Sequence, residues 1–126
     1  MRYMLLIYTN EQDREAVPVE EFSRVLAEHI VLMDKTNQRG IFRGADPLQP
    51  TCTATTVRRQ NGKLTVMDGP FAETKEQLAG YYILDCKDLD EALEWAAKIP
   101  TSGNGSGCIE VRPIRELQPS ASEFAS

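Results

Sequence analysis

The sequence contains few side chains that could carry out chemistry, and the first is its single histidine, His29. This residue falls near the centre of a run of apolar residues spaced at helical intervals. A lone histidine at such a position is either a core residue with both ring nitrogens satisfied or a group for proton transfer near neutral pH. The two interpretations differ in geometry, because a general base must face an accessible cavity and a structural histidine is sealed in the core.

The second candidate is the run Asp68-Gly69-Pro70-Phe71. These residue types suit a turn at the end of a strand, because aspartate hydrogen-bonds to the backbone of its own turn, glycine permits unusual dihedral angles and proline fixes φ. In one interpretation the motif only shapes the chain, and Phe71 is largely buried in the core. In the other interpretation, Asp68 lines a cleft as a base or as an anion.

Other features favour cofactor-free chemistry. The predicted hairpin carries three basic residues, Arg58, Arg59 and Lys63. They either form a solvated face or contact an anionic ligand. The sequence has no glycine-rich phosphate loop and no nucleophile elbow, and one histidine among scattered carboxylates makes a poor metal site. We therefore expect neither a metal nor a cofactor. The three cysteines lack C-x-x-C spacing and are expected to be reduced thiols.

Length and charge place the protein among small single-domain proteins. The 126 residues suit one domain, predicted to cover residues 1–116, followed by a loosely held tail over residues 117–126. Fourteen basic and nineteen acidic residues give a net charge of −5, which argues against a nucleic-acid partner. No apolar run reaches the roughly 20 residues needed to span a bilayer. We expect a cytoplasmic protein without a membrane contact.

Hydrophobic spacing and turn signals predict the elements that position these residues. Strands are predicted over residues 2–9, 41–43, 53–59, 63–67, 80–86 and 108–114. Helices are predicted over residues 18–39 and 89–99, with Gly40 and Pro100 as stops. Asn61-Gly62 predicts a tight hairpin, and Ala45-Asp46-Pro47 is expected to bend the second strand into a loop. Turns or loops are expected at residues 10–15, 72–78 and 102–107.

This order predicts an α+β fold, the ferredoxin-like split βαβ plan with an added β-hairpin and an antiparallel sheet. The two helices are expected to cover one face of the sheet through apolar stripes. These stripes comprise Phe22, Val25, Leu26, His29, Ile30, Leu32 and Met33 on the first helix and Leu89, Ala92, Leu93, Ala96 and Ile99 on the second. The strands over residues 2–9 and 80–86 are apolar at both parities, so the other face needs a cover as well. That cover is either a second copy of the chain or the hairpin and tail.

Four segments resemble the YCII-related family, in its DGPF branch. They read MRYMLLIY from Met1, DGPFAETKE with LAGYY from Asp68, EALEWAAKIP from Glu91 and IEVRPI from Ile109. The resemblance covers nearly all of residues 1–114 in order. It implies a dimeric ferredoxin-like α+β barrel, a homodimer, often encoded near extracytoplasmic-function sigma factors. The activity of the family is mostly undefined.

The resemblance also implies a site. In the wider family, a histidine on the first helix, followed eleven residues later by a glycine, pairs with an aspartate in a proposed active-site dyad, and His29 and Gly40 have this spacing. The partner is either Asp46 or Asp68. In either case the carboxylate would raise the basicity of the ring, which suits proton transfer near neutral pH. Predicted ligand-binding residues are Phe71, Tyr82 and Arg58. The expected function is cofactor-free isomerisation or elimination on a small carbonyl or lactone compound. The alternative is a non-catalytic module that binds a small ligand or a regulatory partner such as a sigma factor.

Overall fold

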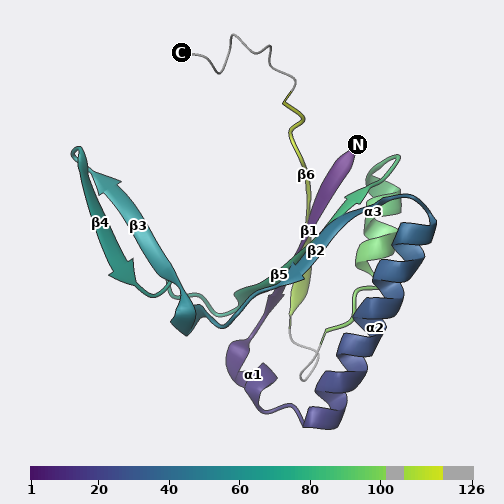
Figure 1. Ribbon diagram of the computed structural model, residues 1–126, viewed down its shortest axis with the longest axis horizontal. Helices are drawn as coiled ribbons and strands as arrows, with labels where there is room; N and C mark the ends of the chain where they lie inside the picture. Colours follow the sequence, from purple (N-terminus) through teal and green to yellow (C-terminus); the bar gives the residue numbers. More distant parts are fainter. Residues whose placement is uncertain (102–106, 118–126) are drawn as a thin grey trace.

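A four-stranded antiparallel sheet forms the centre of the protein and carries two helices on one face (Figure 1). The computed structural model describes residues 1–101 and 107–117. In chain order the elements are β1 (Arg2–Thr9), α1 (Glu11–Glu15), α2 (Val19–Gln38), β2 (Phe42–Pro47), the 3-10 turn η1 (Thr51–Thr53), β3 (Thr55–Gln60), β4 (Lys63–Asp68), β5 (Gln77–Asp85), α3 (Leu89–Ala96) and β6 (Cys108–Pro113). The strand order β2-β5-β1-β6 is that of the ferredoxin-like plan. The predicted α+β, ferredoxin-like fold of the single chain is therefore confirmed.

The core lies between the two central strands, β1 and β5, and the helices. Alternate residues of both strands are buried, as expected for a sheet with one packed face. Leu5 of β1 lies opposite Tyr82 of β5. The largest buried apolar side chains are Tyr3, Leu5, Ile7, Leu32, Tyr82, Leu84, Trp95 and Ile99. β5 begins at Gln77, earlier than the predicted start at residue 80, because pairing with the end of β1 extends the ladder.

Helix α2 ends where the sequence predicts. Gly40 has a φ of 74°, and the amides of Gly40 and Ile41 donate to the carbonyl oxygens of Asn37 and Thr36. This is a Schellman stop, which requires a left-handed residue after the cap. The helix begins after Pro18, which has no side chain able to cap it.

The apolar stripe of α2 is wider than its contact with the sheet. Val25 and Leu32 are buried as predicted, together with Thr36, whose hydroxyl donates to carbonyl oxygens of its own helix and so is satisfied. Phe22, Leu26 and Ile30, predicted to face the sheet, are exposed, as are Leu89 and Leu93 on α3. A straight helix meets a sheet along a narrow line, so the edges of a broad stripe stay in solvent.

Two predicted irregular segments are regular in the structure. Residues 10–15, expected to be a turn, contain the short helix α1, whose first turn is capped by the side chain of Asn10. Ala45-Asp46-Pro47, expected to be a loop, completes β2 at the edge of the sheet, where proline is tolerated. Gly80 permits the close approach of β2, because a Cβ there would lie 2.8 Å from the backbone oxygen of Asp46.

The β3–β4 hairpin projects away from the sheet (Figure 1). Asn61 and Gly62 at its tip have φ angles of 50° and 78°, which confirms the predicted tight turn. Its base is closed by a hydrogen bond from the Gly69 amide to the Ala54 carbonyl. The prediction that Phe71 is largely buried is wrong, because its exposed fraction is 78%. The turn follows β4 at the base of the hairpin, away from the core between the sheet and the helices, so Phe71 has no core to enter.

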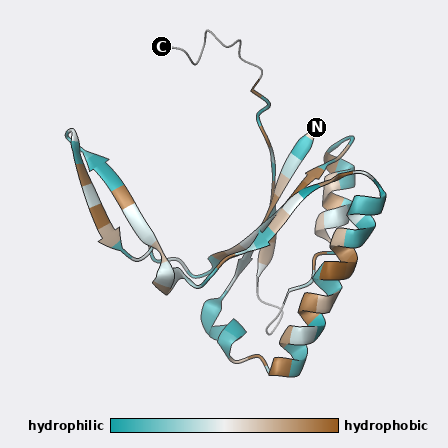
Figure 2. Ribbon diagram, in the orientation of Figure 1, coloured by the Kyte–Doolittle hydropathy of each residue, from teal (hydrophilic) through white to brown (hydrophobic). Residues whose placement is uncertain are grey.

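The second face of the sheet has no described helix against it, whereas α2 and α3 both pack on the first (Figure 2). On this open face Met4 lies opposite Ile83, and Leu6 lies opposite Tyr81. These side chains are only half-buried in the single chain. The apolar character of both faces of β1, predicted from the sequence, therefore leaves one apolar face without a cover among the described residues.

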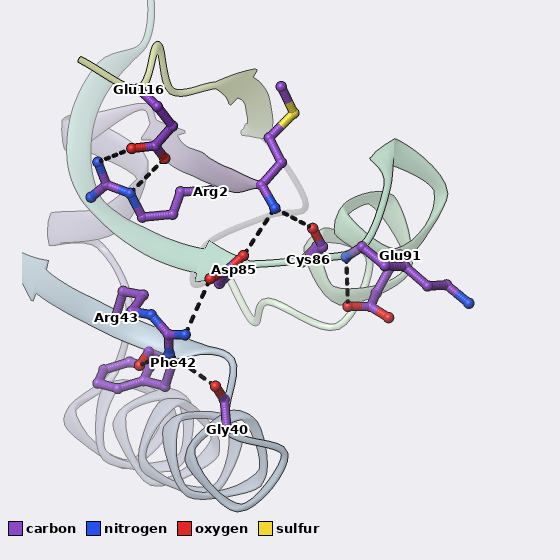
Figure 3. Close-up of polar contacts among 10 residues, drawn as sticks. Arg2, Gly40, Phe42, Arg43, Asp85, Cys86, Glu91 and Glu116 are labelled. Atoms are coloured by element: carbon purple, nitrogen blue, oxygen red, sulfur yellow. Dashed lines mark hydrogen bonds and ion pairs between the residues drawn. The ribbon is translucent and has the colours of Figure 1, made fainter. Parts of the chain in front are cut away.

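Polar contacts join the strands at one end of the sheet (Figure 3). The Asp85 carboxylate accepts from the amino group of Met1 at 3.0 Å and from the Arg43 guanidinium at 3.1 Å. The hydrogen bond from the amino group holds the pKa of the Asp85 carboxyl below its usual value. Arg2 pairs with Glu116 at 2.8 Å. These exposed pairs stabilise the fold only weakly, and they leave the opposite end of the sheet free for the site described next.

Candidate functional site

A cavity of about 230 Å³ lies between α2 and the sheet. On the helix side it is lined by Phe22, Val25, Leu26, His29 and Met33. On the sheet side it is lined by small residues of β2 and β5, among them Ala45, Ala79 and Gly80. Small side chains opposite large ones leave this volume unfilled. Because Phe22 and Leu26 are exposed, the cavity reaches the surface along the outer edge of α2.

A hydrogen-bonded pair forms part of the cavity wall. Nδ1 of His29 lies 2.6 Å from the hydroxyl oxygen of Tyr82. The two rings are nearly parallel, with an interplanar angle of 22° and centroids 5.8 Å apart. His29 comes from α2 and Tyr82 from the central strand β5, so the pair joins the two layers of the fold. Both residues line the cavity, and a bound molecule would therefore meet the pair.

Burial changes the protonation of both groups. It lowers the pKa of His29 below its ordinary value, and the positive charge of Arg14 also acts to lower it. The backbone carbonyl of Pro100 and the carboxylate of Glu28 act in the opposite direction without reversing the shift. Burial raises the pKa of Tyr82 to about 12. Near neutral pH, His29 is therefore neutral and Tyr82 keeps its phenolic proton, a combination that allows the ring to accept a proton.

The structure gives His29 a different partner from the expected aspartate. Within the described residues, no carboxylate forms an ion pair with its ring, and Tyr82 occupies the position predicted for Asp46 or Asp68. Asp46 lines the same cavity, but its carboxylate accepts from the Tyr81 hydroxyl at 2.7 Å. Asp68 ends β4 in the hairpin and does not line the cavity. Asp46 therefore borders the cavity with its carboxylate on the open face of the sheet, and Asp68 lies outside the cavity. The catalytic roles of His29, Asp46 and Asp68 stay predictions.

Of the three predicted ligand-binding residues, one lies at the cavity and two lie away from it. Tyr82 lines the cavity. Arg58 and Phe71 are exposed in or beside the hairpin and do not line it. A ligand in this cavity would therefore contact only Tyr82 of the three within the same chain.

The sequence patterns did not single out two polar residues of the cavity wall, Thr9 and Arg14. Thr9 has the same parity in β1 as Tyr3, Leu5 and Ile7, and this parity was the signal that could have placed it inward. Arg14 lies in the segment predicted as a polar turn, and only the fold brings α1 beside α2. No local pattern marks such a residue, because its position depends on how the chain returns to the sheet.

The structure gives no indication of a metal centre or a membrane span in the part of the chain that it describes. No group of three or more histidine, cysteine, aspartate or glutamate side chains there is arranged to hold a metal ion. None of the helices among these residues is long and apolar enough to cross a membrane. The predicted loop over residues 102–107 and the tail over residues 117–126 lie largely outside the described residues.

Comparison with known proteins agrees with the fold and the sequence motifs. The model of the YCII-related domain matches residues 1–118. An uncharacterized protein of Rhizobium meliloti (strain 1021) is 40% identical over 119 residues, which cover 94% of this chain and 96% of the relative. The match to the family model extends over β1, the residues that line the cavity, and β6. The chain therefore belongs to the YCII-related family.

Proposed function

We propose that this protein binds a small, largely apolar molecule in the cavity beside α2 and presents it to the His29–Tyr82 pair for proton transfer. The observation that carries this proposal is the 2.6 Å contact between His29 Nδ1 and the Tyr82 hydroxyl in the wall of a cavity that reaches the surface. At roughly 30 Å³ for each water-sized position, the cavity has room for about eight such positions. The ligand is therefore a small compound.

The chemistry that fits this site is cofactor-free acid–base catalysis. A neutral His29 accepts a proton from a carbon next to a carbonyl group, either directly or through the Tyr82 hydroxyl, and returns it at another position. This sequence is an isomerisation with no net gain or loss of protons, and an elimination begins with the same first step. The lowered pKa of His29 supports the role of base, because the ring is unprotonated at neutral pH.

Binding is tested by a thermal-shift screen of small carbonyl compounds and lactones, since a ligand that binds only the folded state raises the melting temperature. Ala45→Leu fills the cavity from the sheet side and is expected to abolish the shift. Ala27→Leu is the matched control, because Ala27 is exposed on α2 and does not line the cavity. If no compound stabilises the wild-type protein, or if Ala45→Leu leaves the shift unchanged, the cavity is not the binding site. The alternative function, binding of a regulatory partner, would then be favoured.

Catalysis is tested separately, by following the exchange of carbon-bound hydrogen for solvent deuterium in a bound carbonyl compound by NMR. His29→Gln is expected to keep binding and lose exchange. Equal exchange rates in both proteins would mean that the protein binds the compound but that His29 is not catalytic.

A second copy of the chain is our proposal for the cover of the open sheet face. Leu6 and Met4 lie at the centre of this face, and β6 adds Glu110 and Arg112 opposite them. Charges of opposite sign beside an apolar centre suit a two-fold interface, in which each patch meets its own copy. Sedimentation is expected to give twice the 14.1 kDa mass of one chain, and Leu6→Lys is expected to reduce it to a single chain. Val31→Lys, on the exposed side of α2, is the control; a wild-type monomer at micromolar concentration contradicts the proposal.

A further inference from the structure

Some polar groups in the wall of the cavity have a hydrogen-bond partner among the described residues, and others have none. His29 is paired with Tyr82, and the carboxylate of the bordering Asp46 is paired with Tyr81 on the open face of the sheet. Thr9 is 4% exposed, and its hydroxyl has no hydrogen-bond partner among the described residues. Buried hydroxyl groups usually have a partner, so an unpaired one in a cavity wall indicates a missing hydrogen-bonding group.

Arg14 is the second group for which the described residues provide no polar side-chain partner. It lines the cavity, and its guanidinium carbon lies 5.8 Å from the centre of the Phe22 ring. In the described part of the chain, no carboxylate forms an ion pair with it. The nearby carboxylate of Glu11 accepts instead from the backbone amide and the hydroxyl of Thr51, both at 2.8 Å. A guanidinium beside an apolar cavity, with no counter-ion among the described residues, has its donors available for an anionic ligand.

The charge of Arg14 reaches the candidate catalytic group, since it is one cause of the lowered pKa of His29. A ligand anion beside Arg14 would therefore lie within electrostatic range of the His29–Tyr82 pair. Among the described residues that line the cavity there is no second arginine or lysine. One cation in apolar surroundings balances a single negative charge, which favours a carboxylate over a doubly charged phosphate.

We propose that the ligand of this cavity is a small monocarboxylate, with its apolar body between α2 and the sheet and its carboxylate bound by Arg14. This inference rests on the proposed function and specifies the class of ligand. The planar guanidinium of arginine matches a carboxylate with two parallel hydrogen bonds, which a neutral ligand cannot form.

The test uses two pairs of probes of nearly equal size and shape, hexanoate with hexanamide and benzoate with benzamide. Binding is followed by NMR of the single histidine, whose ring signals report directly on the cavity wall. The carboxylate of each pair is expected to bind about tenfold more tightly than its amide, as a charge-assisted hydrogen bond predicts. Arg14→Gln is expected to make the two equal, whereas the wild-type preference weakens as salt is added.

Arg39→Gln is a matched control, because Arg39 also lies 5.8 Å from an aromatic ring, that of Trp95, but does not line the cavity. This variant is expected to keep the preference for carboxylates. If Arg14→Gln does not fold, Arg14→Lys keeps the charge and is expected to retain a smaller preference.

A second readout separates charge from burial. Hexanoate and hexanamide displace the same water, but only hexanoate offsets the charge of Arg14. The pKa of His29 is therefore expected to be higher in the hexanoate complex than in the hexanamide complex.

The outcomes distinguish this inference from the proposed function. Equal binding of acids and amides, or a preference that survives in Arg14→Gln, overturns the assignment of Arg14 and leaves the binding cavity standing. If no probe of either kind shifts the His29 signals at millimolar concentration, both proposals fail together.

Discussion

The Tyr82 hydroxyl lies 2.6 Å from Nδ1 of His29, and this contact connects the central strand of the sheet to helix α2 at the wall of the cavity. The two residues are 53 positions apart in the chain. Tyr82 is 3% exposed, so its hydroxyl depends on this partner in place of water. The contact therefore affects both stability and the proposed chemistry.

Tyr82→Phe is expected to lower the free energy of unfolding by about 1–2 kcal/mol, because it removes one hydrogen bond and leaves a half-buried ring nitrogen without its protein partner. Urea denaturation measures this loss. Tyr81→Phe is the neighbouring control, since its hydroxyl bonds to Asp46 at the surface, and we expect a smaller loss there. Equal losses in the two variants would mean that the His29–Tyr82 hydrogen bond stabilises the fold no more than the exposed Tyr81–Asp46 hydrogen bond does.

Stability is expected to depend on pH through His29. Burial lowers the pKa of the folded-state ring below the 6.5 of the free side chain. The unfolded chain therefore binds a proton more readily than the folded protein, and stability falls as the pH drops below about 6.5, until the folded-state pKa is reached. Arg14, Glu28 and Tyr82 are the charged or titratable groups that act on or contact this ring.

The measurement compares urea denaturation of the wild type and His29→Gln between pH 8 and pH 5.5, above the range where most carboxylates titrate. The wild type is expected to lose stability relative to the variant over this interval. A constant difference between the two proteins, or an NMR titration of His29 with a midpoint above 6.5, would contradict the lowered pKa.

Two truncations separate the core from the hairpin. Leu5→Ala is expected to cost about 2–5 kcal/mol, because Leu5 is fully buried in the centre of the sheet. Phe71→Ala is expected to change the stability of the single chain by less than about 0.5 kcal/mol, because the ring is exposed. Denaturation at two protein concentrations checks this difference. A large loss for Phe71→Ala that grows with protein concentration would instead place Phe71 in the interface between two copies.

Thr9→Val is expected to stabilise the protein by about 1 kcal/mol, since it replaces a buried hydroxyl that has no partner among the described residues with a methyl group of similar size. Thr36→Val is the opposite control. Its buried hydroxyl donates to the carbonyl oxygens of Leu32 and Met33, so this variant is expected to lose stability. A loss in Thr9→Val similar to that in Thr36→Val would reveal a polar partner for Thr9 outside the described residues.

The sequence by itself determined the features that depend on neighbouring residues. The parity of β1, the glycine stop after α2 and the Asn61-Gly62 turn each follow from the dihedral angles and side-chain directions of a few adjacent residues. From these the order of elements and the ferredoxin-like plan could be predicted. His29 was singled out for the same reason, as a polar residue within a helical apolar stripe, and the structure places it in the wall of the cavity.

Only the tertiary structure decided which side chains meet. The partner of His29 depends on the register between β1 and β5 and on the height of α2 above the sheet, and these are set by packing over the whole core. Arg14 reaches the cavity, and Asp68 and Phe71 leave it, because of the directions in which α1 and the hairpin depart from the sheet. Local dihedral preferences carry no information about such distances, since a small change of angle at one turn moves a distant side chain by many ångströms.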